Sequence, residues 1–113
     1  MTCKCDAYLV RTAVASTTEL TLGFNATPAV QNSDVFNFRI ACDLGSNPAT
    51  YVPVVINVSI GGTVTPVPLL NRFGNQIYSN ELRTRVTYRG YFGSVPTSHV
   101  IALNTPKNCY EVI

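Results

Sequence analysis

The groups best suited to covalent chemistry in this sequence are four cysteines. Cys3 and Cys5 lie close together near the start, whereas Cys42 and Cys109 stand alone. A structural zinc site usually takes cysteine pairs with about two to four residues between them, so we expect no metal here. Because thiols exchange into disulfides, all four are candidates for cross-links between chains. Cys42 has a second interpretation as a buried small side chain, since it ends an apolar alternation.

Nothing else in the sequence forms a catalytic motif. His99 is the single histidine, and no Gly-x-Ser-x-Gly nucleophile motif accompanies it. The 6 acidic residues are scattered singly, rather than paired as acid and base across a cleft. The sequence contains no phosphate-binding glycine loop and no calcium loop. We therefore expect a protein that is not an enzyme and that needs no cofactor.

The composition predicts a neutral, polar surface. In 113 residues, 8 Lys+Arg and 6 Asp+Glu give a net charge of +2, and charged residues make up 12%. The neutral polar residues Thr, Asn and Ser are numerous instead, with 13, 10 and 7 residues respectively. Because little net charge opposes contact between copies, this composition favours self-association. The partners we expect are copies of the chain or other subunits of the same particle. The low net charge speaks against nucleic acid.

Targeting signals are not evident. No apolar run reaches the roughly 18 residues of a membrane helix, so we expect no membrane partner. The first residues, Met1 to Asp6, lack the apolar segment of a secretory signal. We therefore expect synthesis in the cytoplasm without a signal peptide.

Arginine and tyrosine gather between residues 69 and 93. Alternation over a strand expected at 82–92 places Arg83, Arg85, Arg89 and Tyr91 on one face and Tyr88 on the other. A basic face with aromatic rings can bind single-stranded nucleic acid. The same residue types dominate protein–protein contacts, and the low net charge favours this second interpretation. These five residues are candidate interface residues; an ordinary solvated strand with acidic cross-strand partners is the alternative.

These residues have to be positioned by strands, because period-two alternation recurs along the chain and helical periodicity does not. Gly, Pro, Asn and Asp clusters separate the segments. Seven to eight short strands predict an all-β fold, a single small β-sandwich of jelly-roll or Ig-like type. We expect a cysteine-bearing N-terminal extension over 1–6 and a β-sandwich domain over 7–113. The expected strands are 8–14, 19–24, 35–42, 54–60, 63–70, 82–92, 99–103 and 109–113.

One hairpin can be predicted to its register. The pair Gly61-Gly62 suits a two-residue turn with positive φ. Ile60 then lies opposite Thr63, and the apolar residues of both strands share one face. This face is expected to point into the core.

The outer side of that hairpin has its own character. Pro66 and Pro68 would direct their missing N–H groups away from the hairpin partner, so 63–70 is expected to be an edge strand. The outward face is too apolar for simple solvent exposure, and we expect it to meet another subunit or a loop. Its candidate interface residues are Val55, Pro66 and Pro68.

Three features are shared with a known class of fibre subunit: Cys3-Lys4-Cys5 before the first strand, the further cysteines Cys42 and Cys109, and the low-charge surface. In these features the chain resembles the subunits of bacterial endospore appendages. The resemblance implies a small β-sandwich subunit of a fibre. It also implies that Cys3 and Cys5 belong to a connector that cross-links to a neighbouring subunit, with Cys42 and Cys109 as candidate acceptors.

The chain is similar in general character to the decoration and head-fibre proteins of bacteriophage capsids. That resemblance implies a virion accessory protein, and a glycan-binding β-sandwich module is a third hypothesis. The favoured hypothesis is a structural, self-assembling subunit of an extracellular fibre or surface particle, locked by disulfides between subunits. Its expected final location is an extracellular surface, a spore or a virion.

Overall fold

The computed structural model describes residues 7–42 and 51–103, and the all-β prediction is confirmed. The strands expected between 7 and 70 and at 99–103 are present within two residues of their predicted bounds, whereas the one expected at 109–113 lies outside the described residues. The described part contains no helix with the length and apolar character to cross a membrane. The elements are β1 (Ala7–Ala15), β2 (Leu20–Phe24), β3 (Val35–Ile40), β4 (Val54–Ile60), β5 (Thr63–Leu70), the 3-10 helix η1 (Ser79–Glu81), β6 (Thr87–Gly93) and β7 (His99–Leu103).

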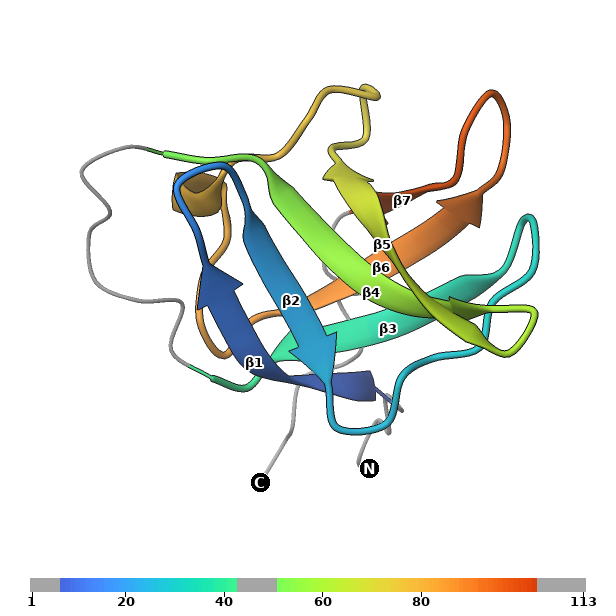
Figure 1. Ribbon diagram of the computed structural model, residues 1–113, viewed down its shortest axis with the longest axis horizontal. Coiled ribbons are helices and arrows are strands. Elements are labelled where there is room, and N and C mark those ends of the chain that lie inside the picture. Colours follow the sequence, from blue (N-terminus) through green and yellow to red (C-terminus); the bar gives the residue numbers. More distant parts are fainter. Residues whose placement is uncertain (1–6, 43–50, 104–113) are drawn as a thin grey trace, which may run out of the picture.

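The seven strands close into a barrel in the order β1-β2-β4-β5-β7-β6-β3, which corrects the predicted sandwich. In Figure 1, β2, β4 and β5 cross the front, while β3 and β6 run behind them. Closure depends on parallel pairings of β1 with β3, β2 with β4 and β5 with β7. Alternation predicts a strand and its two faces but not its neighbours, so these distant pairings left no local signal.

Strand β1 closes the barrel on one side because it serves two partners. Its first residues, Ala7 to Val10, pair in parallel with β3, and the residues from Val10 to Ala15 pair antiparallel with β2. The register shifts between Val10 and Thr12, so Arg11 lies at a bulge. A bulge bends its strand, which allows β1 to turn from one neighbour to the other.

The β4–β5 hairpin has the predicted register. Ile60 pairs with Thr63, and the turn residues Gly61 and Gly62 have φ of +59° and +85°. Positive φ at two successive positions is readily adopted only by glycine, which explains the dipeptide.

The prediction that β5 is an edge strand is wrong. Its last two residues, Leu69 and Leu70, pair in parallel with Val100 and Ile101 of β7. The two prolines nevertheless set where this pairing begins. Because a proline offers no N–H to a ladder, β7 joins β5 only after Pro68.

The core fills the barrel from all sides. Phe38 and Phe92 are its largest fully buried side chains, and they come from β3 and β6. On the opposite strands β4 and β5, Ile56 and Leu69 are fully buried as well. The Phe38 ring stacks on Tyr88 with centroids 5.5 Å apart, which extends the core toward the start of β6.

Candidate functional site

Charged residues of the strands are confined to one side of the barrel. The neighbouring strands β1, β3 and β6 each contain one arginine and no acidic residue. Strands β2, β4, β5 and β7 contain no Lys, Arg, Asp or Glu. We call the outward side of β1, β3 and β6 the arginine wall, formed by Arg11, Arg39, Arg85 and Arg89. The outward side of β4, β5 and β7 is the uncharged wall, formed by Val55, Val64, Pro66, Pro68, Leu70 and Ile101.

Strand register brings the four exposed arginines of the arginine wall together. Asn37 pairs with Arg89, and two residues further along β3, Arg39 pairs with Thr87. Ile40 follows Arg39 on β3, and its backbone carbonyl oxygen accepts a hydrogen bond from the Arg85 N–H at 2.7 Å. On the other side, Ile40 pairs with Val10, the residue before Arg11. The arginines therefore lie at successive levels along one face.

The arginine heads rest on neutral acceptors. Arg39 Nη1 donates to Thr87 Oγ1 at 3.3 Å, and Arg89 Nε donates to Asn37 Oδ1 at 3.5 Å. Each bond uses one of the five N–H donors of a guanidinium, so most donors remain available. Among the described residues, the carboxylates lie in turns and in η1, not on this wall: Glu19, Asp34 and Glu81. Within residues 7–42 and 51–103, no carboxylate of this wall therefore balances its positive charge.

The strand predicted at 82–92 is shorter than expected, and this corrects the arrangement of its arginines. Strand β6 begins only at Thr87. Before it, Arg85 has φ of 66°, a left-handed conformation that ends the extended backbone. Arg83 precedes this turn, and its N–H donates to the Tyr88 hydroxyl at 3.0 Å. Arg83, Arg85 and Arg89 thus do not share one strand face.

The two tyrosines of the predicted interface lie on opposite faces of β6, as the alternation predicts. Tyr88 is half-buried and packs against the core, so it is mainly structural. Tyr91 lies on the outward side of β6 opposite Val35, and its hydroxyl bonds Ser33 Oγ at 3.1 Å. Tyr91 also pairs with Ile101, so it lies where the two walls meet.

The uncharged wall carries a continuous apolar surface over three strands. Val55 of β4 pairs with Pro68 of β5, and Leu70, two residues further along β5, pairs with Ile101 of β7. These four side chains are half-buried, and Val64 at the end of the wall is 55% exposed. Val55, Pro66 and Pro68 are therefore on the outward face, as predicted.

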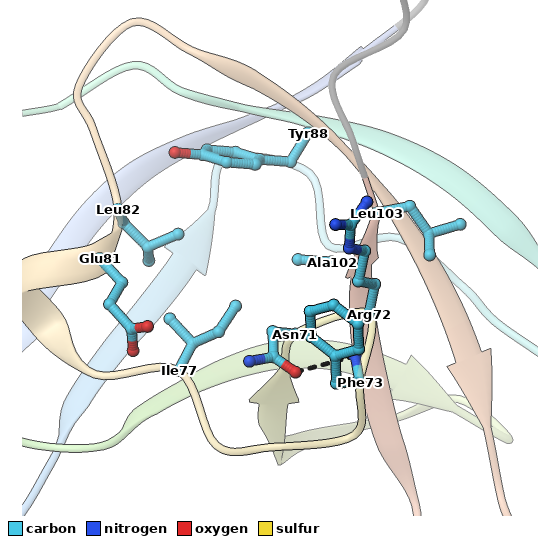
Figure 2. Close-up of a pocket in the computed structure, with 9 residues that line it drawn as sticks. All are labelled: Asn71, Arg72, Phe73, Ile77, Glu81, Leu82, Tyr88, Ala102 and Leu103. Atoms are coloured by element: carbon cyan, nitrogen blue, oxygen red, sulfur yellow. Dashed lines mark hydrogen bonds between the residues drawn. The ribbon is translucent and has the colours of Figure 1, made fainter.

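A cavity of about 350 Å³ lies beside the uncharged wall, between the turn after β5, η1 and the strands β6 and β7. Figure 2 shows Ile77, Leu82 and Ala102 facing its centre, with the Tyr88 ring at one side. Ile77 and Leu82 are 6% and 7% exposed, so the floor is apolar. Arg72 stands at the rim, stacked on Phe73 with its guanidinium carbon 4.8 Å from the ring centroid. The volume suits a small ligand with an apolar body.

The cysteines are only partly within the described structure. Cys42 follows β3, is half-buried and packs against the core, which agrees with the interpretation as a small buried side chain. The other cross-link candidates, Cys3, Cys5 and Cys109, lie outside the described residues. The single histidine lies at the start of β7, where His99 Nδ1 is 2.7 Å from the Thr97 carbonyl oxygen. Residues 7–42 and 51–103 contain no group of three potential metal ligands.

Sequence reasoning missed Arg11 and Arg39 as members of the arginine wall. Each stands alone in its strand segment. The antiparallel pairing of β3 with β6 brings Arg39 beside Arg85 and Arg89, and the parallel pairing of β1 with β3 adds Arg11. No protein family, no curated protein and no solved structure matches the chain. The candidate surfaces therefore have to be interpreted from their own chemistry.

Proposed function

We propose that the protein is a non-enzymatic structural subunit that associates with copies of itself through the uncharged wall. The observation that supports this most directly is the apolar surface from Val55 to Ile101, which crosses three strands without a charged residue. Interface centres are depleted of charge in the same way. Two arginine walls repel each other, so copies approach with least cost along their uncharged walls.

The contact we propose is between faces rather than between strand edges. Pro66 and Pro68 remove two N–H donors from the outer edge of β5, so this edge cannot extend a regular ladder into another chain. The apolar side chains above it remain available for packing.

The association is tested by sedimentation velocity over a range of concentrations. Val64→Arg places a charge in the uncharged wall, and Val14→Arg is its matched control, because Val14 is 65% exposed on β1. We expect the native protein and the control to associate, and Val64→Arg to shift the midpoint at least tenfold to higher concentration. A native protein that stays monomeric throughout, or equal shifts in both variants, contradicts the proposal.

The finer proposal is a fibre or particle subunit on an extracellular surface or spore, in which Cys3 or Cys5 forms a disulfide with Cys42 or Cys109 of a neighbour. Its support is the sequence position of the thiols and the low surface charge. Electrophoresis of native material with and without reductant tests it, together with negative-stain microscopy. We expect a ladder that collapses to one band near 12.3 kDa on reduction, and fibres on the grid.

A virion accessory protein is the alternative, and it predicts discrete oligomers that reductant does not change. The cavity favours a further candidate, a binding module for a small ligand such as a glycan. Its apolar floor and the Tyr88 ring would hold the ligand, and a rise in melting temperature across a sugar panel would reveal it.

A further inference from the structure

We infer that the arginine wall binds the phosphate backbone of a single-stranded nucleic acid. The net charge of +2 averages over two unlike sides, and it hides the concentration of positive charge on one of them. Arg11, Arg39, Arg85 and Arg89 are exposed at successive levels of one face. They come from three neighbouring strands and from the turn before β6, and Arg39 lies diagonally to Arg89 across the β3–β6 pair, so the charges form one basic patch.

The residue type fits phosphate. A guanidinium is always charged, and its planar fork binds two phosphate oxygens at once. Arg39 and Arg89 donate to Thr87 and Asn37, which are neutral and therefore do not reduce the charge of either guanidinium. The wall therefore presents ordered guanidinium donors to a phosphate.

The architecture favours a single strand over a duplex. Duplex recognition usually places a helix or a two-stranded ribbon in a groove, and the arginine wall presents the side of a closed barrel instead. Single strands bind to sheet surfaces through charge and base stacking. Tyr91 lies two residues from Arg89 on the same outward side, and its hydroxyl bonds Ser33, which holds the ring beside this basic patch.

This inference is independent of the proposed self-association. The two walls adjoin at β6 and β7, where Tyr91 pairs with Ile101, whereas β1 and β3 lie on the side of the closed barrel away from β5. Subunits joined through β4 and β5 therefore leave Arg11 and Arg39 accessible. Loss of one property with retention of the other therefore identifies which proposal has failed.

The test is fluorescence anisotropy with a labelled oligo(dT) of about 20 nucleotides, longer than the site of one small β-barrel. Binding is measured between about 50 and 200 mM salt. Four phosphate contacts predict a slope of log K against log salt of about −3, at about 0.7 per contact on a single strand. We expect Arg39→Gln and Arg89→Gln each to weaken binding severalfold and to reduce the slope by about 0.7.

Arg72→Gln is the matched control, because it removes the same charge from the cavity rim rather than from β1, β3 or the start of β6. We expect it to leave the slope unchanged, and thermal unfolding to show that all variants are folded. Absence of binding at about 50 mM salt, or equal effects of Arg72→Gln and Arg39→Gln, overturns the inference. Tighter binding of a duplex of the same length overturns the preference for a single strand. Equal binding of polyglutamate overturns the inference in favour of an acidic protein partner.

Discussion

On the inside, the arginine wall and the uncharged wall are built alike. Phe38 and Phe92 under the first wall and Ile56 and Leu69 under the second are all at most 2% exposed. On the outside the two walls differ in charge and in apolar character. One wall holds spaced cations on neutral acceptors, and the other holds neighbouring apolar side chains and no charge.

The difference shows how one closed barrel can present two surfaces without two domains. In a barrel, inward residues fix stability, and outward residues are free to vary strand by strand. Because β1, β3 and β6 are neighbours in the barrel but not in the sequence, the isolated Arg11 and Arg39 join Arg85 and Arg89 in one surface.

The largest expected effect tests whether the two walls share one core. Phe38→Ala should lower the free energy of unfolding by about 3–5 kcal/mol and Ile56→Ala by about 2–5 kcal/mol, because each leaves a cavity. Urea unfolding measured by circular dichroism and by tyrosine fluorescence should give one coincident transition in each variant. Two separate transitions would show that the sides fold independently.

A smaller loss of stability is expected from changing Gln76, whose side-chain amide links the ends of β4 and β5. Gln76 Nε2 donates to the carbonyl oxygens of Val54, Leu69 and Ile77 at 2.8–3.0 Å. Gln76→Glu replaces this donor with a carboxylate facing three acceptors, and we expect a loss of at least about 1–3 kcal/mol. Asn75→Asp, an exposed amide-to-acid change next to it, should cost no more than about 0.5 kcal/mol in urea unfolding. Similar costs for the two variants would contradict the role of Gln76.

A comparable effect is expected at the seam between the walls. A Cβ at Gly90 of β6 would lie 3.0 Å from Val100 of β7 and 3.1 Å from the Phe36 ring. We expect Gly90→Ala to cost about 1–3 kcal/mol, because the surrounding core has little room to move. Gly23→Ala would meet only the hydroxyl of the exposed Thr12, which can rotate away, so calorimetry should show a smaller loss there. The reverse order would contradict this description of the seam.

The smallest expected effect concerns the arginines themselves. Arg89→Gln should change stability by no more than about 0.5 kcal/mol, because it is exposed and makes one weak bond. Salt should raise the melting temperature of the native protein by screening the like charges, and should raise that of Arg39→Gln less. An arginine variant with a loss of several kcal/mol would mean that the wall serves the fold rather than a partner.

Local features of the fold were predictable from sequence, and long-range ones were not. The Gly61-Gly62 turn and the alternation of its flanking strands fix the hairpin register, because both act between neighbouring residues. The sandwich prediction failed because closure depends on parallel pairs whose partners lie far apart in sequence. The strand at 82–92 was overextended because Leu82, Val86 and Tyr88 continue the alternation through a turn.

The candidate surfaces follow the same division. Val55, Pro66 and Pro68 were predictable as an outward face, since one hairpin contains all three. The arginine wall was not, because Arg39 acquires basic neighbours only when β3 pairs with β6, and Arg11 only when β1 pairs with β3. The turn at Arg85 could not be predicted either, because a positive φ at an arginine has no sequence signature.

The most direct test of the division into two walls is sedimentation velocity of the native protein with and without fluorescent oligo(dT). With separate walls for self-association and for nucleic acid, the label should sediment with the associated species, and the oligonucleotide should leave the association unchanged. If the oligonucleotide instead dissociates the assembly, or is carried only by monomers, both partners compete for one surface and the account is contradicted.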